Sequence, residues 1–134
     1  MKQIAFVAAL LAAALAGCKD KNPFIEGSSP SSVVFPASNV SYSAQVQILF
    51  NQTCTLSGCH DDATRAGTLS LTSYDNTRFT SPSGTIVAGK PDASNLVFRI
   101  EGAVGARMPP TPNPLNQNQI NGIRAWIVEG ALNN

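Results

Sequence analysis

Histidine is nearly absent from this chain, and charge of one sign is scarce as well. His60 is the only histidine, and the chain has three cysteines and two methionines. A zinc site needs three or four histidine, cysteine or acidic ligands held together, so this composition makes zinc a poor candidate. Basic and acidic residues nearly balance, at 9 and 8, and no basic stripe is present. Nucleic acid is therefore not an expected partner.

A long apolar run occurs only at the N-terminus. Residues 4–16 are apolar without interruption, and Lys2 precedes them. This run is shorter than the ~20 residues that cross a bilayer. A basic start, a short apolar core and small residues at the end are typical of a secretory signal peptide, here residues 1–17. Such a peptide places the protein outside the cytoplasm, where disulfides persist.

The end of this segment, "LAGC" at residues 15–18, resembles the lipobox of bacterial lipoproteins. The resemblance implies that Cys18 receives lipid and becomes the mature N-terminus. We therefore expect a protein of the bacterial cell envelope, anchored to the membrane through Cys18 and facing the periplasm or the outside. The alternative is an ordinary signal peptide followed by an unrelated cysteine.

Residues 18–40 are rich in serine and proline and have no sustained hydrophobic periodicity. We interpret them as a lipidated N-terminus and flexible tether, with an ordered strand around "SSVVF" as the alternative. The folded domain is then expected at residues 41–134. A domain of roughly ninety residues often needs a disulfide, a metal or another cofactor to complete its core.

Two segments predict helices. Residues 42–53 can begin at a cap on Ser41 or Ser43, and residues 116–131 begin with Asn116 and Gln119 in the spacing of a capping box. Each segment has an apolar face at three- and four-residue spacing, and Gly130 suits the end of the second helix. The residues of the two faces are Val46, Leu49, Phe50 and Thr53, and Ile120, Ile123, Trp126 and Ile127.

The region between these helices is rich in loops. A short helix is expected within residues 91–100, and "GTLSL" and "GTIV" alternate like strands but are too isolated to predict a sheet. The expected fold class is therefore mainly α, with a loop-rich middle.

The stretch "CTLSGCH" at residues 54–60 carries the chemistry. Haem c is bound through thioethers to two cysteines, and the histidine after the second cysteine ligates the iron, usually in the pattern C-x-x-C-H. Here the gap between Cys54 and Cys59 is four residues, but His60 still directly follows Cys59. The two extra residues must bulge outward, and Gly58 allows the unusual backbone angles that this requires.

Other chemistry fits the same residues. A Cys54–Cys59 disulfide is natural outside the cytoplasm, although a loop this small gives little entropic stabilisation. A thiol redox pair normally has the C-x-x-C spacing, which this stretch lacks. The motif by itself leaves both a haem and a disulfide open.

Met108 offers a second iron ligand. It is the methionine that remains after the signal peptide is removed, and it lies in the proline-rich loop "ARMPPTPNP". Prolines lower the entropy cost of holding this side chain at a metal, and histidine/methionine ligation raises the haem potential. The alternative is a methionine that fills an apolar gap.

Taken together, these pieces resemble a class I c-type cytochrome, and more closely the small cytochrome c domains of bacterial lipoproteins. Such domains have a helix leading into "C…GCH", a "G-x-L-x-L" stretch, an "M-P-P" loop and a closing "W-I-x-x-G-A". The corresponding pieces of this chain are "QILFNQTCTLSGCHD" at 47–61, "AGTLSL" at 66–71, "IVAGKPDASNLVFRI" at 86–100, "RMPP" at 107–110 and "INGIRAWIVEGA" at 120–131. The resemblance covers residues 44–132.

The resemblance implies a small class I cytochrome c fold whose N- and C-terminal helices pack around one covalently bound haem c. It implies that Cys54 and Cys59 carry the haem, that His60 is the proximal ligand and that Met108 is the distal ligand. The expected function is a single-electron carrier, not an enzyme, that exchanges electrons with redox proteins of the periplasm or membrane. Two alternatives are a haem-based gas sensor or ligand-binding protein, and a non-haem lipoprotein with a Cys54–Cys59 disulfide. Candidate neighbours of the haem propionates are Arg65, Arg107 and Trp126, although ordinary surface or core roles are the favoured interpretation of all three.

Overall fold

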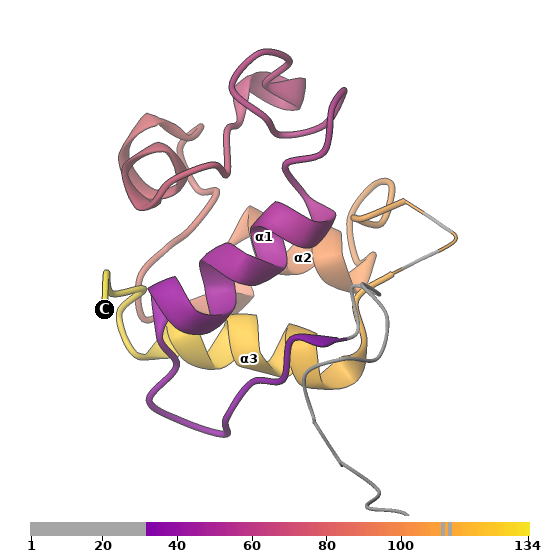
Figure 1. Ribbon diagram of the computed structural model, residues 1–134. Coiled ribbons are helices and arrows are strands. Elements are labelled where there is room, and N and C mark those ends of the chain that lie inside the picture. Colours follow the sequence, from indigo (N-terminus) through magenta and orange to yellow (C-terminus); the bar gives the residue numbers. More distant parts are fainter. Residues whose placement is uncertain (1–31, 111, 113) are drawn as a thin grey trace, which may run out of the picture.

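The computed structural model describes residues 32–110, 112 and 114–134, and within these residues the protein is helical with no strand (Figure 1). The mainly α fold class is thus confirmed, and the two strand-like pieces are loops. The elements in chain order are the π-helix η2 (Tyr42–Val46), α1 (Gln47–Thr53), the 3₁₀ turn η3 (Ala66–Thr68), the π-helix η4 (Asn76–Thr80), the 3₁₀ turn η5 (Pro91–Ala93), α2 (Asn95–Glu101) and α3 (Gln117–Val128).

The first predicted helix forms as η2 and α1, which follow one another without a break over residues 42–53. Ser41 is its cap, because the Ser41 hydroxyl accepts a hydrogen bond from the backbone nitrogen of Ala44 at 3.2 Å. The four residues of the predicted apolar face, Val46, Leu49, Phe50 and Thr53, are all buried.

The last predicted helix forms as α3, and it begins with the expected capping box. The Asn116 side chain accepts from the Gln119 backbone nitrogen at 3.0 Å, and the Gln119 side chain accepts from the Asn116 nitrogen at 3.0 Å. The helix ends before Gly130, which has a φ of +102°. Its predicted apolar stripe, Ile120, Ile123, Trp126 and Ile127, is buried.

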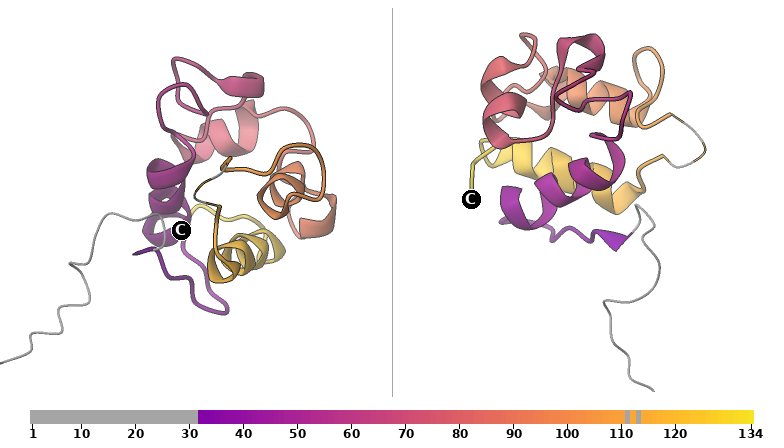
Figure 2. Two further views of the ribbon diagram at one scale, coloured as in Figure 1. Left: turned by 90° about the vertical axis from the view of Figure 1, so that its right-hand side faces the viewer. Right: turned by 45° about the horizontal axis from the view of Figure 1, so that its top comes forward.

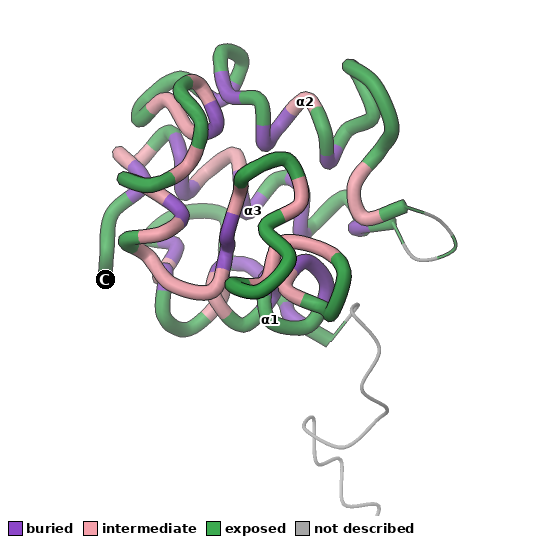
Figure 3. Tube along the Cα trace, turned by 90° about the horizontal axis from the view of Figure 1, so that it is seen from above, coloured by how far each residue is buried: buried purple, intermediate pink, exposed green. Residues whose placement is uncertain are grey.

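One hydrophobic core joins the helices. The short helix α2 packs against α3 and buries Leu96, Val97 and Ile100. From the other side, the Tyr42 ring lies 5.5 Å from the Trp126 ring, measured between ring centroids. Buried positions therefore recur along α1, α2 and α3 (Figure 3), and residues 55–80 form loops on one side of these helices (Figure 2).

The segment before α1 packs against α3, whereas the sequence favoured a flexible tether and left an ordered strand around "SSVVF" as the alternative. Val33, Phe35 and Val40 are buried, whereas Val34 between them is 72% exposed. The Phe35 nitrogen donates to Asn118 Oδ1 at 2.8 Å, and Asn118 Nδ2 donates back to the Phe35 carbonyl at 3.0 Å. This two-way pairing ties the segment to α3 through its backbone.

Gly122 explains how the segment comes so close to α3. A Cβ atom at Gly122 would lie 2.1 Å from Cγ of Phe35, so only glycine leaves room for this ring. Further along, the Glu129 carboxylate accepts from the backbone nitrogens of Asn39 and Val40. The prediction of a tether up to residue 40 is therefore wrong for residues 33–40. Burial of the alternate side chains Val33 and Phe35 holds this segment in place in spite of its serine- and proline-rich composition.

The predicted signal peptide, the lipidation site Cys18 and the tether up to residue 31 lie outside the described residues. Among the helices that the structure describes, none is long and apolar enough to span a bilayer.

Candidate functional site

Cys54 lies at the end of α1, with its side chain in the hydrophobic core. Its backbone nitrogen donates to the Phe50 carbonyl at 2.8 Å, and the residue is 8% exposed. Burial raises the pKa of the Cys54 thiol to about 11, and the nearby Thr53 hydroxyl only partly opposes this. Cys59 is half-buried, and both cysteines are free thiols with no disulfide between them.

The four residues between the cysteines form a closed loop. The His60 nitrogen donates to the Cys54 carbonyl at 3.0 Å, and the Cys59 nitrogen donates to the Leu56 carbonyl at 2.9 Å. The chain thus leaves α1 at Cys54 and comes back to the end of this helix at His60. Leu56, Ser57 and Gly58 are exposed, and Gly58 has a φ of +86°. The extra residues bulge outward, as the adjacency of Cys59 and His60 requires.

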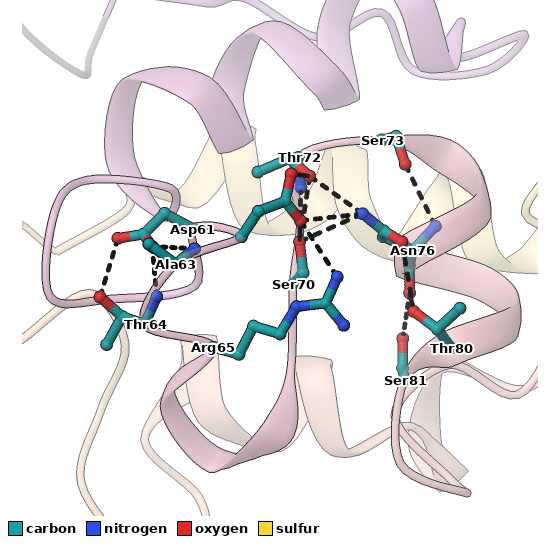
Figure 4. Close-up of polar contacts among 11 residues, drawn as sticks. Asp61, Ala63, Thr64, Arg65, Ser70, Thr72, Ser73, Asn76, Thr80 and Ser81 are labelled. Atoms are coloured by element: carbon teal, nitrogen blue, oxygen red, sulfur yellow. Dashed lines mark hydrogen bonds and ion pairs between the residues drawn. The ribbon is translucent and has the colours of Figure 1, made fainter.

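Asp61 closes this loop from its far side. Its carboxylate accepts from the backbone nitrogens of Gly58 at 3.1 Å, Ala63 at 2.8 Å and Thr64 at 2.6 Å. It also accepts from the Thr64 hydroxyl at 3.1 Å (Figure 4). These hydrogen bonds, led by that of the Thr64 backbone, lower the pKa of Asp61. The sequence interpretation missed Asp61, although an aspartate three residues before a threonine in a loop favours this kind of turn.

The His60 ring is oriented by a backbone carbonyl. Its Nδ1 lies 3.0 Å from the carbonyl oxygen of Ala66. A carbonyl oxygen only accepts, so we assign the proton to Nδ1, and Nε2 keeps the lone pair that binds a metal. Two backbone hydrogen bonds fix the loop around His60: the Ala66 nitrogen donates to the Cys59 carbonyl, and the Leu71 nitrogen donates to the His60 carbonyl. The imidazole is thus held in one orientation, and its role as an iron ligand stays a prediction.

Asp62 ties the His60 segment to the next loop. Its carboxylate accepts from the Ser70 hydroxyl at 2.7 Å, the Thr72 hydroxyl at 2.9 Å and Asn76 Nδ2 at 3.1 Å. Hydrogen bonds from Ser70 and Thr72 lower the pKa of Asp62, and Arg65 contributes an ion pair at 3.3 Å. Figure 4 shows the donors Ser70, Thr72 and Asn76 gathered at one place. The loop that carries His60 is therefore fixed to the segment that leads into η4.

Met108 lies in the loop after α2. Its backbone nitrogen donates to the Arg99 carbonyl at 2.8 Å, which attaches the loop to the last turn of α2, and its side chain is half-buried. The neighbouring Arg107 donates from Nε to the Ile100 carbonyl at 3.0 Å and from Nη2 to the Leu115 carbonyl at 3.4 Å. The loop is anchored at both ends, and the role of Met108 as an iron ligand stays a prediction.

The donor set fits haem c. Two free thiols flank a loop that brings His60 back to Cys54, and the imidazole has a free Nε2. A thioether is available from Met108. No group of three or more histidine, cysteine or acidic side chains that could hold a metal ion forms within residues 32–110, 112 and 114–134, so the zinc alternative gains no support.

A family model described as Planctomycete cytochrome C matches residues 57–112. This match supports a cytochrome c-like domain. The matched residues include Cys59, His60 and Met108, whereas Cys54 precedes them. Such a domain suggests covalently bound haem c and a haem-binding, electron-carrying role. Neither a curated protein nor a solved structure matches the chain.

Proposed function

We propose that this protein is a monohaem c-type cytochrome that carries single electrons while a lipid on Cys18 holds it at the membrane. The observation that carries the proposal is the orientation of His60. Its Nδ1 faces the Ala66 carbonyl, and the neighbouring Cys59 is positioned by the backbone of the same loop, inside the region that resembles a cytochrome c. Bound haem supplies an iron that alternates between the ferrous and ferric states.

The chain contributes attachment, orientation and exclusion of water. Cys54 offers its thiol from within the apolar core, and Cys59 offers a second thiol directly before His60. His60 binds through Nε2, and Met108 completes the ligation with a thioether that keeps the potential high. If His60 and Met108 both held the iron of a bound haem, the site would favour electron transfer over ligand binding or catalysis. We therefore propose redox proteins of the periplasm or membrane as partners, and no enzymatic activity.

The intact mass and the visible spectrum of the protein test this function together. Expression in a bacterium competent in haem attachment should give a red protein whose mass exceeds that of the lipidated chain by one haem. Single and double alanine variants of Cys54 and Cys59 serve as matched controls for the two thioethers. A colourless protein of apoprotein mass would contradict the proposal and favour the disulfide lipoprotein.

Carbon monoxide separates a carrier from a gas-binding protein. The reduced protein should keep its spectrum under carbon monoxide at neutral pH, because Met108 occupies the distal position. Rapid and complete carbon monoxide binding would favour the sensor alternative.

The lipid anchor has its own test. Membrane fractionation should find the wild type with the membranes and a Cys18→Ala variant in a different fraction. A variant that stays with the membranes as the wild type does would contradict anchoring through Cys18.

A further inference from the structure

Arg78, in η4, has a buried nitrogen that nothing in the described chain satisfies. Its Nη1 donates to the Ile86 carbonyl at 3.2 Å. Its Nε is buried and has no hydrogen-bond partner. Among the described residues, no other buried side-chain nitrogen or oxygen lacks a partner. The ion pairs among the described residues involve Arg65 and Arg124 and do not include Arg78.

A buried N–H without an acceptor is costly, because the group loses its hydrogen bond to water and gains none in return. The natural partner is a carboxylate, whose two oxygens match the planar fork of a guanidinium. The carboxylate tied to the same loops, that of Asp62, already accepts from Ser70, Thr72 and Asn76. Among the described residues no acceptor faces this nitrogen, which leaves it open to an acceptor of another kind.

Hydrogen bonds place Arg78 on the segment that is fixed to the His60 loop. Asn76, two residues before Arg78, donates to Asp62, two residues after His60. The Leu71 nitrogen donates to the His60 carbonyl at 3.0 Å. On its other side Arg78 donates to Ile86, whose side chain packs against the core. The segment that carries Arg78 is thus tied by hydrogen bonds to the loop that carries the proposed proximal ligand.

Haem brings two propionate carboxylates into any site where it is attached. We propose that Arg78 binds a haem propionate through Nε, the nitrogen left without a partner, while Nη1 stays on the Ile86 carbonyl. This inference rests on the proposed function, since it requires the haem. It adds a residue that anchors the propionate side of the cofactor, opposite in role to the thioethers that anchor the vinyl side.

The three candidates for this role from sequence are engaged elsewhere. Arg65 pairs with Asp62 at 3.3 Å. Arg107 donates to two backbone carbonyls, and Trp126 Nε1 donates to the Leu132 carbonyl at 2.9 Å. Arg78, by contrast, has a buried Nε with no hydrogen-bond partner among the described residues.

Matured holoprotein carrying Arg78→Gln, Arg78→Lys or Arg65→Gln tests the inference. The readouts are the reduction potential and the propionate bending band in the resonance Raman spectrum of the ferrous form. Arg78→Gln should shift the propionate band. It should also favour the ferric form by about threefold or more at a fixed potential, because an unneutralised carboxylate stabilises the additional positive charge on the iron.

The other two variants separate the causes. Arg78→Lys keeps the charge but not the fork, so its band should shift while its potential falls less than that of Arg78→Gln. Arg65→Gln removes a cation bound to Asp62, and it should leave both readouts as in the wild type.

A wild-type band in Arg78→Gln overturns the inference. If that variant does not mature, a wild-type band in Arg78→Lys overturns it equally. An Arg65→Gln variant that shifts the band as much as Arg78→Gln does also overturns it. A colourless wild type overturns both this inference and the proposed function, whereas a red wild type with an unaffected Arg78→Gln overturns the Arg78 assignment alone.

Discussion

At the scale of single residues, the site depends on where a few protons and lone pairs point. The Ala66 carbonyl directs Nδ1 of His60, which leaves Nε2 with a lone pair for the proposed ligation. Asp61 gathers backbone N–H groups on both sides of His60. The cysteines and the histidine were predictable because their adjacency is a sequence pattern. Asp61 was missed although its bonds to Ala63 and Thr64 are local, because its bond to Gly58 forms only when the loop folds back.

Met108 is tested by its removal. Met108→Ala should leave the haem attached, since attachment uses the cysteines, but should lower the reduction potential because a thioether ligand favours ferrous iron. Potentiometric titration gives the answer, and Val104→Ala is a control on an exposed side chain between α2 and Met108. An unchanged potential in Met108→Ala would remove Met108 as a ligand.

Asp61 is expected to act on the yield of mature protein. Asp61→Ala removes the acceptor for Gly58, Ala63 and Thr64, so the bulge should open and the two thiols should be held less well for attachment. The ratio of haem absorbance to protein should fall. The exposed Asp75 supplies the control variant Asp75→Ala. Equal haem content in the wild type and Asp61→Ala would show that the loop holds its shape without the carboxylate.

At the scale of elements, the helices formed where periodicity and caps agreed. The capping box at Asn116 and the cap at Ser41 start α3 and the first helix at the predicted places. The interpretation failed for residues 33–40, which carry too few apolar residues for a periodic pattern. The position of this segment depends on a tertiary contact, because Gly122 on α3 leaves room for the Phe35 ring.

Gly122→Ala tests this close approach. Alanine is the better helix former by about 1 kcal/mol, but here its methyl group would overlap the Phe35 ring, and overpacking typically costs about 1–3 kcal/mol. Denaturant unfolding of the holoprotein should therefore show a net loss of stability. The same change in a Phe35→Gly background should be neutral or stabilising, because the Phe35 Cβ, which would lie 2.4 Å from the added methyl group, is removed together with the ring. Equal effects of Gly122→Ala in both backgrounds would contradict the contact.

Tyr42 links η2 to η4 and α3. Burial raises the pKa of Tyr42, so the buried phenol contributes stability that is complete below its unfolded value of about 10 and is lost as the pH rises through the folded value. Tyr42→Phe should cost about 0.5–1.5 kcal/mol at neutral pH for its hydrogen bond, but should lose less stability than the wild type above pH ~10. Unfolding at several pH values measures both effects. Parallel curves for the two proteins would exclude Tyr42 as the titrating group.

At the scale of the whole molecule, a small helical domain is closed by its own N-terminal segment. The backbone pairing of Phe35 with Asn118 and the two N–H groups held by Glu129 fasten this segment along α3. The packed part of the chain therefore includes residues 33–40 and does not start at residue 41. This leaves less chain between Cys18 and the folded unit than the composition suggested.

Two truncated forms test the domain boundary. A mature haem domain that begins at Ser32 should be as stable as one that begins at Cys18. A domain that begins at Ser41 should be less stable, on the order of 3–5 kcal/mol for the loss of Phe35 alone. Thermal or denaturant unfolding of the two forms decides this. Equal stability of the Ser32 and Ser41 forms would show that the segment adds nothing to the fold.

The sequence by itself determined the local features, namely the helices, their caps and the order of Cys54, Cys59 and His60, because these depend on residues a few positions apart. The tertiary structure decided what depends on residues far apart in the chain. The contact of Phe35 with Gly122 cannot be predicted from hydrophobic periodicity. The same holds for the Nε of Arg78, which is buried without a hydrogen-bond partner. The physical reason is that helix formation and capping are short-range, whereas burial and hydrogen-bond satisfaction are settled only when distant segments meet.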